Sequence, residues 1–262
     1  MTSPVLVTGG TGTLGRQVVP RLRDAGREVR VLSRRSHAPE HVTGDLLAGE
    51  GIEPAVRGAG TIVHLAGATK GDDEATRNLV GAASRAGAQH LVYISVVGTD
   101  RIPLVSGLDR AMFGYFGSKL AAERVVADSG LPWTTLRATQ FHDLLVTVAQ
   151  QMVKLPAIPV PAGFRFQPVD AGEVAGRLVE LTLAAPAGLV PDMAGPRVYR
   201  MADLLRGYLR ARGKRRRIVA VRIPGKAASA LRAGANLAPE RAVGHRTWEE
   251  FLAERVGSPG DS

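Results

Sequence analysis

The chain has 262 residues, of which 45% are hydrophobic, and its formal net charge is +10. This length and composition suffice for one large α/β domain or for one domain with a small appendage, and we expect the second. The absence of cysteine excludes disulfides, thiolate metal sites and thiol catalysis. The amino-terminal residues lack the pattern of a secretion signal, and no apolar run approaches the ~20 residues that span a bilayer. We therefore expect a cytoplasmic protein with no membrane partner.

A basic cluster, Lys214 to Arg217, raises the question of nucleic-acid binding. The other basic residues are spread along the chain, and the aromatic residues that could stack on bases make up only 5% of it. A solvated surface or a helix end is the simpler interpretation, because a basic run after a helix suits the negative end of the helix dipole. We expect no nucleic-acid partner, and the sequence shows no cluster of metal ligands.

The stretch that organises the chain is an apolar run, residues 5–8, that breaks into glycines and restarts with helical spacing. Gly9, Gly12 and Gly15 recur every three residues, which permits a tight turn and a close approach to a pyrophosphate. The following helix would direct its free N–H groups at the phosphates. A glycine-rich turn is also a common structural device, but its place between a strand and a helix favours a dinucleotide site. Here we expect cofactor contacts at Gly9, Thr11, Gly12, Thr13 and Leu14.

The second predicted strand, residues 28–32, is followed by Ser33, Arg34 and Arg35. In a dinucleotide fold this tip meets the adenosine ribose, where a carboxylate would bind the 2′-hydroxyl of NAD and repel a 2′-phosphate. A hydroxyl and two guanidiniums can instead hold the phosphate through charge-assisted hydrogen bonds. We predict NADP as the cofactor, with these three residues as contacts. The alternative is a pair of exposed arginines in a loop.

Further predicted strands at residues 41–46, 61–67 and 89–95 alternate with helical stretches. This alternation predicts an α/β fold with a Rossmann-type, doubly wound parallel sheet. Ligands of such sheets bind beyond the carboxyl ends of the strands. Two roles stay open for Asp45, contact with the adenine edge and capping of the next turn. His64, in mid-strand, is interpreted as a satisfied core histidine. The contacts expected at these strand ends are Asp45, Leu46, Leu65, Ala66, Gly67 and Ser95.

Tyr115 and Lys119 precede a predicted helix, residues 120–127, and their spacing places them on one helix face. A neighbouring ammonium stabilises a phenolate and lowers the tyrosine pKa from about 10, so the tyrosine can act as a general acid or base nearer neutral pH. The lysine can also bind a cofactor ribose. Such a pair is often only an exposed helical pair, but its place after the fifth strand makes it a candidate catalytic pair.

Several motifs resemble those of the atypical short-chain dehydrogenase/reductase family, close to its NmrA-like NAD(P)H-binding group. They are Thr8-Gly9-x-x-Gly12-x-x-Gly15, Leu65-Ala66-Gly67, residues 93–98, Tyr115-x-x-x-Lys119, residues 135–141 and residues 167–175. The resemblance implies hydride transfer between NADP(H) and a small carbonyl or quinone substrate. It implies that Tyr115 supplies the proton, while Lys119 tunes it and holds the nicotinamide ribose. It also implies cofactor contacts at Ala138, Thr139 and Phe141.

One position departs from the family pattern. A serine near the end of the fifth strand usually helps to hold the substrate oxygen, whereas Val97 stands at or near that place and Ser95 lies two residues earlier. Loss of one such donor can raise a barrier by ~2.7 to 4 kcal/mol. The alternative to an enzyme is therefore a non-catalytic NADP(H)-binding redox sensor that acts through a protein partner.

The remaining chain predicts a substrate-binding lobe. We interpret residues 1–262 as a single NAD(P)-binding Rossmann domain in which residues 143–166 and 188–256 form this small lobe. Pro156, Pro159 and Pro161 predict an irregular loop over the site. His142 is the histidine nearest to such a pocket in the sequence, although a core or surface role is favoured. No motif identifies the substrate, the reaction direction or the oligomeric state.

Overall fold

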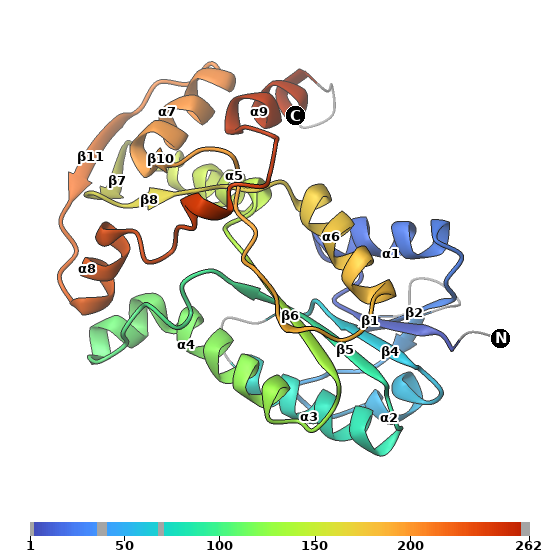
Figure 1. The fold of residues 1–262 in the computed structure, drawn as a ribbon. Helices are drawn as coiled ribbons and strands as arrows, with labels where there is room; N and C mark the ends of the chain where they lie inside the picture. Colours follow the sequence, from blue (N-terminus) through green and yellow to red (C-terminus); the bar gives the residue numbers. More distant parts are fainter. Residues whose placement is uncertain (1–2, 36–40, 68–70, 258–262) are drawn as a thin grey trace. The chain divides into compact units, whose positions relative to one another are not determined.

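The computed structural model describes residues 3–35, 41–67 and 71–257, and the chain forms two compact units (Figure 1). Unit 1 consists of Met1–Val96, Gly114–Arg137 and Ala171–Pro191. Unit 2 consists of Val97–Phe113, Ala138–Asp170 and Asp192–Ser262. Each unit is thus built from three separate segments of sequence.

Unit 1 is built on a seven-stranded parallel sheet with the order β3-β2-β1-β4-β5-β6-β9. The predicted Rossmann-like α/β fold is confirmed. The chain moves outward from β1 to β3 and then resumes on the other side of β1 at β4, which creates a switch point between β1 and β4. The strands are β1 (Val5–Thr8), β2 (Val29–Ser33), β3 (His41–Thr43), β4 (Thr61–His64), β5 (His90–Val96), β6 (Trp133–Ala138) and β9 (Gly188–Leu189).

Helices cover both faces of this sheet (Figure 1). On one face, Leu6, Ile62 and Leu91 are fully buried in a core with residues of α2, α3 and α4. On the other face α1 packs against α6. Burial of each large aliphatic side chain contributes roughly 1.5 to 3 kcal/mol, so the sheet is stabilised from both sides. The helices are α1 (Gly15–Asp24), α2 (Ile52–Val56), α3 (Asp72–Arg85), α4 (Gly107–Ala127), of which the part from Gly114 onward belongs to unit 1, and α6 (Ala171–Leu183).

Unit 2 combines helices with two small sheets, in which β7 pairs with β11 in parallel and β8 pairs with β10 in antiparallel orientation. Its main core lies among α5, α7 and α9, where Tyr208, Trp248 and Phe251 are buried. Among the described residues, no helix is long and apolar enough to cross a membrane. The elements are α5 (His142–Met152), β7 (Ala157–Pro161), β8 (Arg165–Phe166), β10 (Tyr199–Arg200), α7 (Met201–Ala211), β11 (Arg217–Val221), α8 (Lys226–Ala233), the 3-10 turn η1 (Pro239–Arg241) and α9 (Trp248–Gly257).

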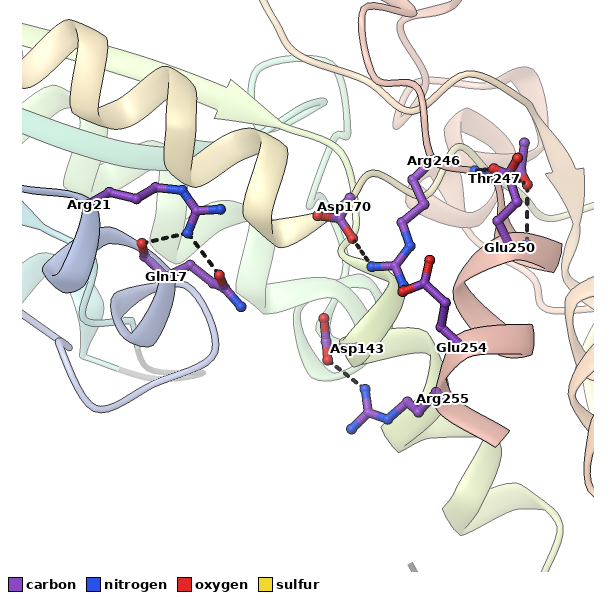
Figure 2. A network of polar contacts seen from close by, with 9 residues as sticks. All are labelled: Gln17, Arg21, Asp143, Asp170, Arg246, Thr247, Glu250, Glu254 and Arg255. Atoms are coloured by element: carbon purple, nitrogen blue, oxygen red, sulfur yellow. Dashed lines mark hydrogen bonds and ion pairs between the residues drawn. The ribbon is translucent and has the colours of Figure 1, made fainter. Parts of the chain in front are cut away.

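Ion pairs attach the last helix of unit 2 to its surroundings (Figure 2). Arg246 binds Asp170 (2.7 Å) and also contacts Glu254, while Arg255 of α9 binds Asp143 of α5 (2.6 Å). The Arg246 guanidinium lies 4.9 Å from the centre of the Phe251 ring. Asp170 is therefore part of a structural ion-pair network.

Two local expectations are wrong. The segment with Pro159 and Pro161 is the regular strand β7, because β11 pairs with one of its edges and a proline without an N–H is tolerated in such an edge strand. Helix α4 begins at Gly107, well before residue 120, so Tyr115 and Lys119 both lie inside it.

Candidate active site

A cleft of about 890 Å³ lies in unit 1, where the turns that follow β1, β2, β3 and β4 come together. This is the carboxyl edge of the sheet, at its switch point, where open α/β sheets bind ligands. Most of the predicted cofactor contacts line the cleft, namely Gly9, Thr11, Gly12, Ser33, Arg34, Arg35, Asp45, Leu46, Leu65, Ala66 and Gly67.

Glycine stands at the three positions of the first turn for different structural reasons. A Cβ atom on Gly9, whose φ is +68°, would lie 2.6 Å from the backbone nitrogen of Ala66. A Cβ atom on Gly15 would collide with the backbone at Gly9 and Gly10. At Gly12, which lines the cleft, a Cβ would meet only the Gly9 carbonyl, at 3.3 Å. The fold itself requires Gly9 and Gly15, whereas Gly12 leaves space for a group that enters the cleft.

The amino terminus of α1 is suited to an anion. Leu14 occupies the N-cap position without a side-chain cap, and the first turn contains no acidic residue. The free N–H groups and the positive end of the dipole can therefore act on a phosphate. The Leu14 side chain is buried and Thr13 is exposed, so a cofactor contact at Leu14 would come from its backbone.

Two groups of polar side chains line the cleft after β2 and β3. At the tip of β2 the side chains are Ser33, Arg34 and Arg35, without a carboxylate. Asp45, after β3, accepts hydrogen bonds from the N–H groups of Leu47 (2.8 Å) and Ala48 (3.3 Å). The turn-capping role of Asp45 is therefore present. Its position in the cleft leaves contact with an adenine as a prediction.

Lys119 of α4 is held in a buried polar group beside the cleft. Its Nζ atom lies 3.1 Å from Asp72 Oδ2 and donates to the Tyr93 hydroxyl (3.2 Å), which in turn donates to Asp72 (3.2 Å). All three side chains are almost completely buried, and Asp72 lines the cleft. A Cβ atom on Gly67 would lie 3.3 Å from Lys119 Nζ, so the ammonium reaches the cleft wall at that glycine.

Tyr115 shows the opposite of the expected pKa shift. Its side chain is 37% exposed. Desolvation, and to a smaller extent the charge of Asp72, raise the pKa of Tyr115 to about 12. The expected lowering by Lys119 is wrong, because the ammonium is engaged by Asp72 and Tyr93. The phenol is therefore protonated at neutral pH.

His64 connects two parts of the cleft wall. Its Nδ1 accepts from Thr8 Oγ1 (2.7 Å), and its Nε2 lies 3.0 Å from Thr76 Oγ1, which donates to the Asp72 carbonyl. Thr76 can then only accept from the ring, so the neutral histidine carries its proton on Nε2. Burial, with help from Lys119, lowers the pKa of His64 to about 4. The geometry agrees with a satisfied core histidine.

The end of β5 contains one buried group without a partner. The Ser95 hydroxyl is buried and forms no hydrogen bond with a described residue. Val97 is fully buried in a small apolar cluster with Ala194 and Ala238 of unit 2. Because a valine side chain has no hydrogen-bond donor, the side chain of Val97 cannot donate to a substrate oxygen.

The predicted contacts at the last residue of β6 and just after it belong to unit 2. Ala138 and Thr139 are buried, and the Thr139 hydroxyl donates to the Gln167 carbonyl. Phe141 forms a β-bridge with Val169. Contact of Ala138, Thr139 and Phe141 with a cofactor stays a prediction.

Five cleft residues were missed from the sequence. Leu32, Gly44 and Leu47 neighbour predicted contacts, so the strand ends pointed to them. Asp72 and Ala75 belong to α3, and an acidic residue in the first turn of a helix is by itself an ordinary structural feature. The missed residues that line the cleft are Leu32, Gly44, Leu47, Asp72 and Ala75.

The parallel sheet, the glycine turn and the cleft at the switch point define a dinucleotide-binding α/β protein. Residues 9–154 match the family model described as NAD(P)H-binding. The chain belongs to this NAD(P)H-binding family, and the predicted resemblance to the NmrA-like group of atypical short-chain dehydrogenase/reductases is confirmed.

Known proteins of similar sequence and fold include reductases and a dehydrogenase. A Streptomyces griseus (4-alkanoyl-5-oxo-2,5-dihydrofuran-3-yl)methyl phosphate reductase is 34% identical over 52% of this chain and 48% of its own length. A Mycolicibacterium neoaurum 3-beta-hydroxysteroid dehydrogenase is 39% identical over 34% of this chain and 31% of its own length. These matches span half or less of the relatives. The Escherichia coli NADPH-dependent quinone oxidoreductase in complex with NADPH has the same fold, with a TM-score of 0.79, 17% identity and coverage of 97% and 100% of the two chains.

Proposed function

We propose that the protein is an NADP(H)-dependent oxidoreductase that acts on a small carbonyl or quinone compound. The observation that carries the proposal is the cleft itself, with a glycine turn at one end and Ser33, Arg34 and Arg35 at another. Similar proteins that are named reductase and dehydrogenase support an oxidoreductase class. A bound nicotinamide cofactor supplies or accepts a hydride.

The cleft residues divide the binding of the cofactor among them. The space at Gly12 and the uncapped end of α1 suit the pyrophosphate. Arg34 and Arg35 suit the 2′-phosphate, since guanidinium groups form forked, charge-assisted hydrogen bonds with phosphate oxygens. Lys119 lies behind Gly67, where its ammonium can bind a ribose hydroxyl.

Tyr115 is the proposed proton donor for reduction of the substrate oxygen. A pKa of about 12 keeps its phenol protonated at neutral pH, so the proton to be donated is present, although a general acid transfers its proton most readily when its pKa lies near the working pH. The buried Asp72 and Tyr93 fix Lys119 in position, so the lysine can orient the cofactor with little loss of side-chain freedom. Ser95, with its unpartnered hydroxyl, is available to a cofactor or substrate oxygen.

Titration of NADPH and NADH by fluorescence tests the cofactor choice. We expect NADPH to bind at least tenfold more tightly, because each charge-assisted hydrogen bond to the 2′-phosphate contributes about 1.5 to 3 kcal/mol. The Arg34→Ala/Arg35→Ala variant should lose this preference and keep its NADH affinity. Arg57→Ala/Arg124→Ala removes two exposed arginines away from the cleft and serves as the matched control. Equal binding of NADPH and NADH by the unaltered protein would contradict the choice of NADP.

Turnover is tested with NADPH and a set of ketones, aldehydes and quinones. Removal of a general acid typically lowers the rate by 10²- to 10⁴-fold, and Tyr115→Phe should show a loss in this range without a change in NADPH affinity. Phe116→Tyr/Tyr115→Phe moves the phenol by one position on the helix and should not restore the rate. Unchanged turnover in Tyr115→Phe would remove Tyr115 from the mechanism.

A redox sensor is the second candidate, and the buried Val97 favours it. Because Val97 offers no donor where the related enzymes usually have a serine, the chain can bind NADP(H) with little or no turnover. This candidate predicts a protein partner whose affinity differs between the NADP⁺-bound and NADPH-bound forms. Partner capture that is insensitive to the cofactor's redox state would exclude it.

A further inference from the structure

The positive charge of the chain is concentrated in one segment of unit 2. Residues 204–239, from α7 through α8, contain ten of the 34 lysines and arginines and no aspartate or glutamate. The other 24 basic residues are equal in number to the 24 acidic residues of the whole chain. The net charge of +10 therefore arises from this segment, and the rest of the protein is balanced.

Much of this charge lacks an internal counter-ion. Arg210, Lys214, Arg215 and Arg217 are exposed, and none of them forms an ion pair with a described residue. Arg215 and Arg216 lie between two open clefts of about 590 and 290 Å³, whose walls also include Lys154 and Arg210. We call the region formed by Lys154, Arg210, Lys214, Arg215, Arg216 and Arg217 the basic surface. It has the charge for an anionic partner.

An exposed apolar ribbon adjoins the basic surface. The parallel register of β7 and β11 places Val219 beside Pro159 and Val221 beside Pro161. Val219 and Val221 are 41% and 44% exposed, and Leu155, just before β7, is 45% exposed. Successive residues of a strand face opposite sides. Ile158 and Val160 of β7 therefore fill the core, while Val219 and Val221, which lie beside Pro159 and Pro161, face solvent.

We propose that this face of unit 2 docks onto the surface of a lipid bilayer with anionic headgroups. The lysines and arginines would bind the headgroup phosphates, and each cation near such a surface contributes to the attraction. The aliphatic side chains of the ribbon would enter the interfacial layer, which removes their exposed apolar area from water. This adsorption needs no membrane-spanning segment, so it is compatible with the finding that no helix in the described part of the chain could cross a bilayer.

A nucleic acid fits the same surface less well. Binding of single strands relies on aromatic side chains that stack on bases. The large exposed apolar residues of this region, Leu155, Val219 and Val221, are aliphatic, whereas Tyr208 of α7 is buried. A phosphate backbone would neutralise the arginines and leave the apolar ribbon in water. The combination of free cations with exposed aliphatic residues therefore favours a bilayer.

Co-sedimentation of the full chain with vesicles tests the proposal. We expect binding to vesicles of phosphatidylcholine with phosphatidylglycerol, no binding to phosphatidylcholine alone, and release by 0.5 M salt, which screens the attraction. Lys214→Gln/Arg215→Gln/Arg217→Gln should weaken binding at least tenfold. Arg23→Gln/Arg57→Gln/Arg124→Gln removes the same charge from exposed positions of unit 1 and should bind as the unaltered chain does.

The Val219→Thr/Val221→Thr variant tests the apolar ribbon separately, since threonine keeps the β-branched shape. It should weaken vesicle binding severalfold while NADPH affinity stays unchanged. Three results would overturn the proposal: no sedimentation with anionic vesicles, equal loss in the unit 1 control, or tighter binding to DNA or RNA than to the vesicles. The NADPH titration reports folding of unit 1, and circular dichroism reports folding of each variant as a whole.

Discussion

His64 in unit 1 and His142 in unit 2 are both completely buried, yet their surroundings differ. His64 has a hydrogen-bond partner on each ring nitrogen. Neither ring nitrogen of His142 has a partner among the described residues. Instead its ring stacks against Phe251 and Trp248, with centroid distances of 4.8 and 5.9 Å. Burial lowers the pKa of both to about 4.

The comparison separates two uses of a neutral histidine. In unit 1 the imidazole joins strands β1 and β4 to helix α3, next to the cleft, and its polar atoms are necessary. In unit 2 the imidazole acts as a flat ring in an aromatic cluster, so an apolar ring of similar size should replace it. The hydrogen bonds of His64 with Thr8 and Thr76 hold the cleft wall of unit 1 in one geometry. The aromatic cluster around His142 in unit 2 relies on packing instead.

The largest expected effect concerns Asp72, whose carboxylate pairs with the Lys119 ammonium in unit 1. Asp72→Asn leaves the buried Lys119 ammonium without its counter-ion, which should destabilise the protein by about 3 to 5 kcal/mol in urea unfolding. Asp73→Asn, which affects only an exposed pair with Arg77, should change stability by less than about 1 kcal/mol.

The double variant Asp72→Asn/Lys119→Met removes both charges. If the penalty comes from an unpaired buried ammonium, this variant should recover much of the lost stability. A double variant as unstable as Asp72→Asn alone would contradict the assignment and would point to lost packing or to the hydrogen bond from Tyr93.

Acidification should destabilise both units. The folded histidines stay neutral down to about pH 4, while the unfolded ones bind a proton below about 6.5. Stability is therefore complete above pH 6.5 and falls as the pH decreases toward 4, by roughly 2 kcal/mol for each of the two histidines at pH 5. Urea unfolding at several pH values measures this slope, and a flat profile between pH 7 and 5 would refute it.

The next effect distinguishes the two histidines directly. His64→Leu leaves the hydroxyls of Thr8 and Thr76 without their partner, which should lower stability by about 2 kcal/mol. Because Thr8 also accepts from the Ala66 N–H group in the cleft wall, NADPH affinity should decrease as well. If His64→Leu were as stable as the unaltered protein, the hydrogen bonds of His64 would contribute no more to stability than the stacking of His142 does.

The smallest effect is expected at His142. His142→Phe keeps a ring beside Phe251 and Trp248 and removes two unpartnered nitrogen atoms, so stability at pH 7 should change by less than about 1 kcal/mol, or increase. The same variant should lose about half of the acid sensitivity. A loss of more than 2 kcal/mol at pH 7 would show that the imidazole has a polar role.

The sequence was sufficient for the sheet, because its buried parallel strands are nearly continuous apolar runs and glycines follow β1 at a diagnostic spacing. It was insufficient for β7, where Pro159 and Pro161 indicated a loop. Those prolines are compatible with a strand only because β11, nearly sixty residues later, pairs with it. That pairing is a long-range contact with no local signal.

The candidate site shows the same division. The cleft residues that follow β1 to β4 came from local patterns of sequence, since each strand end is a short motif. The surroundings of Lys119 did not, because Asp72 and Tyr93 reach it from α3 and β5. The spacing of Tyr115 and Lys119 gave their helix face but not the anion that engages the lysine, so the predicted direction of the Tyr115 pKa was wrong.

The packing of α1 against α6 bears on the order in which the protein can assemble during synthesis. Helix α6 and strand β9 complete unit 1 from residues 171–191, after the chain has already passed through the first two segments of unit 2. The family match ends at residue 154, so a fragment of that length would leave the α6 side of α1 uncovered. A nascent chain would therefore complete unit 1 only after the ribosome has released the segment beyond residue 191. Until then chaperones would meet the exposed apolar face of α1.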